Sequence, residues 1–182
     1  MQNQQDRLIK ACKKGNRLAQ MQLYDNYAQA MFTIACRYVK NEEEAKDVMQ
    51  EGFLKAFLNI KSYQPHSSFG AWLKRIVINQ SLDALKKRKV EFSNDGLETL
   101  NIIEDDDWTF DNSITKNQIL DAIEQLNTKH KIVVKLYLIE GYDHQEISEI
   151  LKIPVKTSRT QLRRGKTNLR AILKSTYDEA GY

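Results

Sequence analysis

Apolar residues recur at intervals of three and four along most of this chain, which is the spacing of amphipathic helices. The clearest stretch spans residues 42–61. Asn41 can cap its first free N–H groups, Glu44 can reach back in a capping box, and three consecutive glutamates lie at the positive end of the helix dipole. One face of this helix, which we expect to form the core, collects Ala45, Val48, Met49, Gly52, Phe53, Ala56, Phe57 and Ile60.

The same pattern predicts two groups of four helices. The first group lies near 4–14, 17–39, 42–61 and 69–89, and the second near 114–126, 129–140, 143–151 and 155–174. Residues 91–112 have no helical or strand period and cluster Asp, Asn, Gly and Ser, as a spacer does. We therefore predict an all-α protein with a four-helix domain at 1–90, an acidic linker at 91–112 and a second helical domain at 113–182.

Local signals in the second domain predict a helix-turn-helix. Gly141 lies where a helix can end in a left-handed cap, and Asp143 can cap the next helix with Glu146 at its third position. Pro154 ends that helix within a short turn, and Val155 begins the last one.

Composition narrows the class of protein. The chain has only 7 Gly and 2 Pro, which favours helices over sandwiches and barrels. It lacks an apolar run of about 18 residues, and its first ten residues lack the apolar core of a secretory signal, so we expect a cytoplasmic protein that does not insert in a membrane. Cys12 and Cys36 are expected to be reduced core residues. No cofactor or metal is expected, because the run of acids at 105–107 lacks the spacing of a calcium loop.

Charge is strongly segregated along the chain. Residues 1–90 carry 16 Lys and Arg against 8 Asp and Glu, residues 91–113 carry 8 acids and no base, and residues 114–182 carry 12 bases against 8 acids. Two basic blocks on either side of an acidic segment indicate two surfaces for a polyanion, and nucleic acid is the first candidate.

The helix predicted at 155–174 has a narrow docking side and a broad cationic side. Val155, Ser158, Leu162 and Gly165 share the docking side. The other side and its borders carry Lys156, Thr157, Arg159, Thr160, Gln161, Arg163, Arg164 and Lys166. A solvated cationic face would normally include acids, but residues 152–174 contain none, so we predict insertion into the major groove of DNA.

The helix predicted at 42–61 carries a second stripe beside its core face. This stripe has carboxylates at one end and leucines at the other: Asp47, Gln50, Glu51, Leu54 and Leu58. It suits a partner helix with basic and apolar groups. The alternative is that both leucines pack inside their own domain while the acids face water.

The helix predicted at 69–89 is apolar around most of its circumference and ends in the basic run 86–89. Trp72 is expected in the core, and an Asn79–Asp83 hydrogen bond is favoured over a functional role for that pair. The preceding loop, "SYQPHSS", combines an aromatic ring with hydroxyl and imidazole groups, so it could hold an unstacked base.

Three segments together resemble the bacterial RNA polymerase sigma factors of the extracytoplasmic-function type. They read "DVMQEGFLKAF", "SSFGAWLKRIVINQSLDALKK" and "YLIEGYDHQEISEILKIPVKTSRTQLRRGKTNL", and the resemblance covers nearly the whole chain, including domain order and linker length. It implies a first domain that binds the polymerase β′ clamp helices and the −10 element, and a second that binds the −35 element and the β flap. It also implies an acidic linker near the RNA exit path and an anti-sigma partner.

The resemblance also implies roles for individual residues. Asp47, Gln50 and Glu51 match the clamp-binding positions, to which the stripe adds Leu54 and Leu58. The −10 set comprises Tyr63, His66, Ser67, Ser68 and Phe69 in the base-capturing loop, with Lys74, Arg75 and Asn79 on the helix beside it. Arg159, Thr160, Arg163 and Arg164 match upstream DNA contacts, and the cationic face adds Lys156, Thr157 and Lys166.

The chain departs from the family pattern at three positions. Asn127 stands where the family usually has Pro, Lys156 where it often has Gly, and Ser158 where it has a small apolar residue, so base preference does not carry over. A stand-alone helix-turn-helix regulator is the first rival, and would need a dimer and a palindromic site. A nuclease using the acids at 104–107 is the second, but it lacks paired catalytic groups, and we expect no enzyme.

Overall fold

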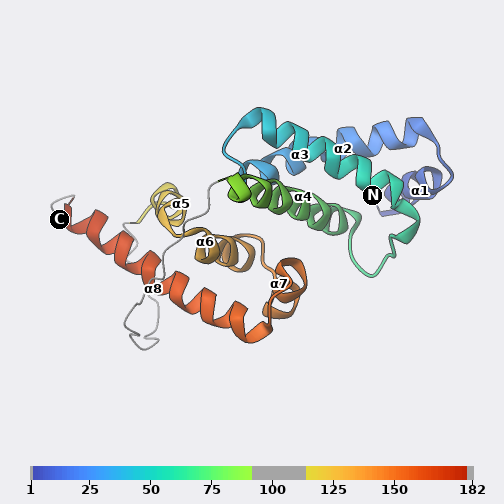
Figure 1. The fold of residues 1–182 in the computed structure, drawn as a ribbon. Helices are drawn as coiled ribbons and strands as arrows, with labels where there is room; N and C mark the ends of the chain where they lie inside the picture. Colours follow the sequence, from blue (N-terminus) through green and yellow to red (C-terminus); the bar gives the residue numbers. More distant parts are fainter. Residues whose placement is uncertain (1, 92–113, 180–182) are drawn as a thin grey trace. The chain divides into compact units, whose positions relative to one another are not determined.

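The computed structural model describes residues 2–91 and 114–179 and divides the chain into two compact units. All the regular secondary structure in the described residues is helical, as predicted (Figure 1). The predicted linker, apart from Glu91, and the acids at 104–107 lie outside the described residues.

The described part of the first unit, residues 2–91, contains four α-helices and one short 3₁₀ turn. They are α1 (Gln2–Lys13), α2 (Arg17–Cys36), α3 (Glu42–Leu58), η1 (Ile60–Ser62) and α4 (Phe69–Glu91). The third helix ends three residues earlier than predicted. Asn59 ends it by donating from its side-chain amide to the Lys55 carbonyl at 2.9 Å, and the chain tightens into η1.

The face of α3 predicted to form the core does so, except that Phe57 is only half-buried. Asn41 caps the helix as expected, but it accepts from the Glu43 N–H at 2.8 Å, not from the Glu44 N–H as the predicted capping box requires. The packing of α3 on α4 depends on Gly52, because a Cβ there would lie 2.8 Å from Cγ2 of Val77. Glycine therefore brings the two helices into close contact.

The second unit packs its last helix against the other three (Figure 1). Its elements are α5 (Lys116–Gln125), α6 (Thr128–Val134), the π-helical turn η2 (Lys135–Ile139), α7 (His144–Leu151) and α8 (Val155–Glu179). A glycine again sets the closest contact, because a Cβ on Gly165 would lie 2.6 Å from Cγ2 of Val134.

The helix predicted at 129–140 is interrupted by the π-helical turn η2. Lys135, at the start of this turn, is 6% exposed and pairs with Glu124 of α5. Burial would raise the pKa of Glu124, but the hydrogen bond and charge of Lys135, with those of Lys131, lower it below its ordinary value. Asn127, which stands where the family usually has Pro, caps α6 by accepting from the His130 N–H at 3.0 Å.

The two cysteines differ. Cys12 is buried as expected, whereas the expectation for Cys36 was wrong, because Cys36 is exposed at the last position of α2. Met31, Ile34 and Ala35 form the buried side of this part of α2, and Cys36 lies on another side of the helix, which faces solvent.

Candidate nucleic-acid and protein-binding surfaces

The helix-turn-helix is formed by α7 and α8, as predicted. Asp143 accepts from the Glu146 N–H at 2.8 Å, and Glu146 accepts from the Asp143 N–H at 2.9 Å, which completes the capping box. Gly141 has the predicted left-handed conformation, with φ of 77°. The helix α7 ends at Leu151 and is capped by Lys152, whose backbone is also left-handed. Pro154 directly precedes α8.

The docking side of α8 is narrow because small residues form much of it. Ser158 is fully buried, and its hydroxyl lies 2.9 Å from Nδ1 of His144. Gly165 lies directly on α6, and Leu162 is 5% exposed. Ser158 thus replaces an apolar contact with a hydrogen bond between the two helices of the motif.

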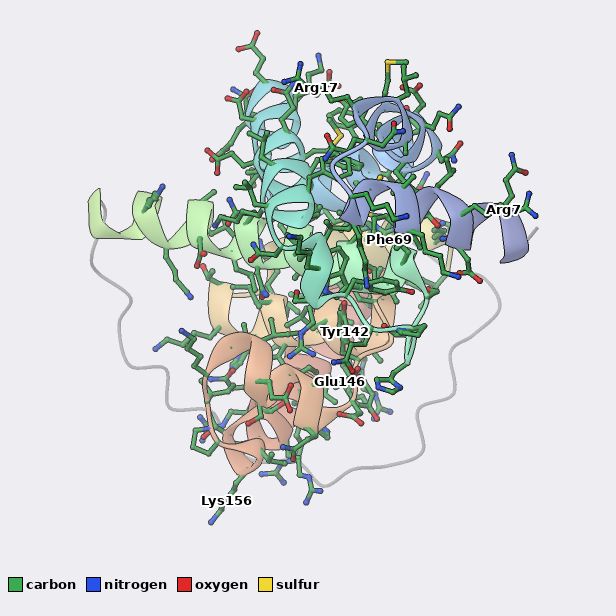
Figure 2. All side chains as sticks on the ribbon, turned by 90° about the vertical axis from the view of Figure 1, so that its right-hand side faces the viewer. Arg7, Arg17, Phe69, Tyr142, Glu146 and Lys156 are labelled. Carbon is green, nitrogen blue, oxygen red and sulfur yellow. The ribbon has the colours of Figure 1, made fainter. Side chains whose placement is uncertain are left out.

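The opposite side of α8 is open to solvent. Exposed side chains on it are Lys156, Arg159, Arg163 and Arg164, while Thr157, Thr160 and Lys166 are half-buried. Lys156 extends away from the ribbon of α8 (Figure 2). Thr160 donates its hydroxyl to the Lys156 carbonyl at 3.0 Å, so in this conformation it offers a ligand an acceptor.

His144 is half-buried and stacks on Tyr137, with ring centroids 4.9 Å apart. Burial lowers the pKa of His144, and the positive charges of Arg159 and Lys166 lower it further against the opposing effect of Asp143. A neutral imidazole that is unprotonated at Nδ1 can accept a hydrogen bond from the Ser158 hydroxyl.

The second stripe of α3 is open to solvent along its whole length. Its five residues, Asp47, Gln50, Glu51, Leu54 and Leu58, are all exposed. Leu54 is 63% exposed and Leu58 is 83% exposed, so the alternative that they pack inside their own domain is wrong. An acid-edged apolar ridge of this kind is typical of a protein-binding surface.

Sequence reasoning also missed a pair of exposed apolar residues on α2. Leu18 is 69% exposed and Met21 is 56% exposed, both near the start of α2. Tyr24 contacts Phe53 with ring centroids 4.7 Å apart, which places the first half of α2 beside the second half of α3. The apolar spacing of residues 17–39 did not distinguish these side chains from core residues.

The loop before α4 has a buried frame and an exposed tip. Tyr63 is 7% exposed and Phe69 is 1% exposed, and their rings lie with those of Tyr27 and Trp72 in one aromatic cluster. Neither ring is exposed to stack on a base in this structure, and the burial of both rings stabilises the loop.

The exposed tip of this loop contains His66, Ser67 and Ser68. Two hydrogen bonds hold its frame. Tyr63 donates its hydroxyl to the Ser67 carbonyl at 2.8 Å, and Lys13 of α1 donates to the Tyr63 carbonyl at 2.7 Å.

On α4, Lys74 and Arg75 are half-buried and Asn79 is exposed. Asp83 pairs with Lys86 at 3.6 Å. Trp72 is half-buried within the aromatic cluster rather than fully in the core. Sequence reasoning gave no role to Gln80, which the structure buries beside Glu51.

In 2–91 and 114–179, no group of three or more His, Cys, Asp and Glu residues is arranged to hold a metal ion. Across the same ranges, no helix has the length and apolar character needed to cross a membrane.

The described residues form a two-unit helical protein of the helix-turn-helix class with an exposed, acid-edged apolar ridge on α3. Residues 23–91 match the family described as Sigma-70 region 2, and residues 116–169 match Sigma-70, region 4. The chain therefore belongs to the sigma-70 family, in its extracytoplasmic-function (ECF) group.

Similar proteins agree with this assignment. The ECF RNA polymerase sigma factor SigW of Bacillus subtilis is 31% identical over 177 residues, which cover 91% of this chain and 95% of SigW. The RNA polymerase sigma-H factor of Pseudomonas aeruginosa is 26% identical over 98% of both chains.

Two solved structures share the fold. CnrH in complex with the cytosolic domain of CnrY has a TM-score of 0.57 at 22% identity, covering 92% of this chain and 96% of CnrH. The sigma factor RpoE of Bartonella quintana, in complex with the anti-sigma factor NepR, has a TM-score of 0.57 at 20% identity, covering 85% of this chain and 96% of RpoE.

Proposed function

We propose that this chain binds core RNA polymerase in the cytoplasm and directs it to promoters, where it recognises two DNA elements and helps open the duplex. The observation that carries the proposal is the presence, in one sigma-70 family chain, of an exposed acid-edged apolar ridge and an exposed cationic recognition helix. The polymerase performs the chemistry, and this chain supplies binding and specificity without catalysis.

The ridge on α3 is proposed to bind the β′ clamp helices. Asp47, Gln50 and Glu51 supply polar and charged contacts, and Leu54 and Leu58 bury apolar surface. Leu18 and Met21 widen this apolar surface onto α2, so that an amphipathic helix of the polymerase can contact both helices.

The second unit is proposed to bind the −35 element through α8, and the β flap through another face. Arg159, Arg163 and Arg164 are exposed and can reach base edges or phosphates, and Lys156 is exposed at the first turn. Thr157, Thr160 and Lys166 lie at the half-buried edge of the same face.

The loop before α4 is proposed to bind the −10 element with its exposed tip. His66, Ser67 and Ser68 can hydrogen-bond the edge of an unstacked base, while Tyr63 and Phe69 fix the loop from inside. Lys74, Arg75 and Asn79 on α4 are proposed to contact the adjacent strand.

An anti-sigma protein is proposed as a regulatory partner. CnrH is recorded in complex with the cytosolic domain of CnrY, and RpoE with the anti-sigma factor NepR. The exposed leucines of α3 offer such a protein an apolar surface that it can cover in competition with the polymerase.

Reconstituted transcription tests the proposal. Added to sigma-free core polymerase, the protein should give transcripts from specific start sites on a promoter template. A stand-alone regulator would bind the DNA without starting transcription, and that result, together with failure to co-sediment with core polymerase, would reject the sigma assignment.

A further inference from the structure

Gln80 of α4 links two oppositely charged side chains of α3. It is 6% exposed, whereas Glu51 and Lys55 are exposed. Its side-chain amide donates from Nε2 to Oε2 of Glu51 at 2.7 Å, and its Oε1 accepts from Nζ of Lys55. Because an ammonium only donates and a carboxylate only accepts, one amide orientation satisfies both partners.

The link lies in an open groove of about 650 Å³ between α3 and α4. Asp47 and Glu51 contribute to the α3 wall, and Gln80 and Asp83 to the α4 wall. Asp47 and Glu51 are also the carboxylates of the exposed ridge. A buried amide therefore holds a surface carboxylate at the edge of the proposed protein-binding surface.

We propose that Gln80 is a positioning residue of the polymerase-binding surface, which fixes the Glu51 carboxylate in the conformation that a cationic side chain of core polymerase engages. This inference rests on the proposed function of the α3 ridge. The bond from Gln80 occupies part of the acceptor capacity of one carboxylate oxygen, so the group retains capacity for a second, cationic donor. An ordered side chain loses less conformational entropy when the partner binds.

The Gln80 side-chain amide also affects whether Glu51 and Lys55 of α3 pair with each other. Glu51 and Lys55 are four residues apart, and a glutamate followed at this distance by a lysine favours direct pairing. Gln80 bonds to both groups and holds them apart. The carboxylate is thereby kept available to the polymerase instead of being neutralised by its own helix.

A double-mutant cycle tests this role. Gln80→Met keeps an unbranched side chain of similar volume but removes both hydrogen bonds. It should weaken the affinity of the full chain for core polymerase by about 3- to 10-fold, which corresponds to ordering one side chain. In a Glu51→Gln background the same change should have no further effect, and in an Asp47→Asn background it should keep its full effect.

Two controls separate positioning from folding. Ser81→Ala removes a neighbouring buried polar group whose hydroxyl donates to the Val77 carbonyl of its own helix at 2.9 Å, and it should leave polymerase affinity unchanged. Thermal unfolding is measured for every variant. If Gln80→Met does not fold, Gln80→Glu keeps the bond to Lys55 but repels Glu51, and it should show the same dependence on background.

Each other outcome rejects the proposal. Unchanged affinity in Gln80→Met, or an equal loss in the Glu51→Gln background, means that Gln80 does not act through Glu51. If Glu51→Gln alone leaves polymerase binding unchanged, the assignment of the α3 ridge fails as well. The single and double variants therefore distinguish the two failures.

Discussion

The helices α3 and α8 both present an exposed functional face, but the two faces differ in chemistry. On α3 the face combines carboxylates with leucines that are 63% and 83% exposed. On α8 the exposed positions between 156 and 164 are cationic, and residues 152–174 contain no acid. Exposed apolar area requires a partner that can exclude water, whereas uncompensated positive charge requires a polyanion. The comparison therefore supports the proposal that α3 binds a protein and α8 binds nucleic acid.

The largest expected effect tests the proposal that the α3 ridge binds core polymerase. Asp47→Lys combined with Glu51→Lys places two cations where the polymerase is proposed to present cations. Because close charge pairs across an interface contribute several kcal/mol, co-sedimentation with core polymerase should weaken by about 100-fold or more. Affinity for promoter DNA measured with the protein alone should not fall.

The matched control for this variant is Asp6→Lys, a charge reversal at an exposed position of α1. It should bind polymerase as the parent does. Equal loss of polymerase and DNA binding in the α3 variant, with a lost helical signal in circular dichroism, would mean that the first unit had unfolded, and the charge assignment would then lack support.

A second prediction uses the feature that the two helices share, which is a glycine against a valine. Gly52→Ala and Gly165→Ala should destabilise their own units by about 1–3 kcal/mol, because the new Cβ would lie 2.8 Å from Val77 and 2.6 Å from Val134. Alanine otherwise stabilises a helix interior relative to glycine, so a loss of stability has the opposite sign to propensity. Thermal unfolding of each variant measures it.

Shortening the facing valine provides the control for the glycine variants. Val77→Ala should restore part of the loss in Gly52→Ala, and Val134→Ala should do the same for Gly165→Ala, whereas the crossed combinations should not. Gly52→Ala should reduce polymerase binding more than DNA binding, and Gly165→Ala the reverse. Stabilisation by either alanine would contradict the close contact.

Much of this arrangement follows from local sequence. The helical period, the Asp143 capping box, Gly141 and Pro154 act over a few residues, so the helices and the helix-turn-helix were predictable from the sequence. The exposed stripe of α3 and the cationic face of α8 follow from the same period, because each lies opposite or beside a core face.

The features that were not predicted depend on contacts between distant segments. The turn η2 begins at Lys135, which pairs with Glu124 eleven residues earlier. The burial of Phe69 depends on Tyr27 of α2, which no local pattern reveals. Gln80 meets Glu51 only because α3 and α4 pack together. The loop proposed to bind a base was therefore located in the sequence, but its buried and exposed residues were not separated.

A third prediction tests the DNA contacts proposed for α8. Arg164→Ala should weaken binding to the −35 element by about 1–3 kcal/mol and relax base preference at one position, if the exposed guanidinium forms two hydrogen bonds to a guanine. Lys156→Ala should weaken binding to all sequences more evenly. Binding titrations on matched DNA variants compare the two, and an unchanged preference in Arg164→Ala would reassign this arginine to phosphate contact.

A fourth prediction tests whether the polymerase-binding surface proposed for α3 extends onto α2. Leu18→Gln with Met21→Gln should weaken polymerase binding by about tenfold, since burial of a large apolar side chain contributes about 1.5–3 kcal/mol when complete and both residues are already partly covered. Ala30→Gln, at an exposed position in the other half of α2, is the control. If the double variant binds core polymerase as tightly as the parent, Leu18 and Met21 do not belong to the polymerase-binding surface.

The smallest expected effect concerns the acid stability of the second unit. Burial and neighbouring positive charges lower the pKa of His144 in the folded protein, so the unfolded chain binds more protons once the pH falls below its ordinary value of about 6.5. This group therefore contributes stability at neutral pH that is lost as the pH falls below that value, when protonation also removes the acceptor for Ser158. In thermal unfolding, His144→Gln should lose less stability than the parent between pH 7.5 and 5.5, because an uncharged amide can keep the bond to Ser158. An equal loss of stability in parent and variant would contradict the assignment of this pH dependence to His144.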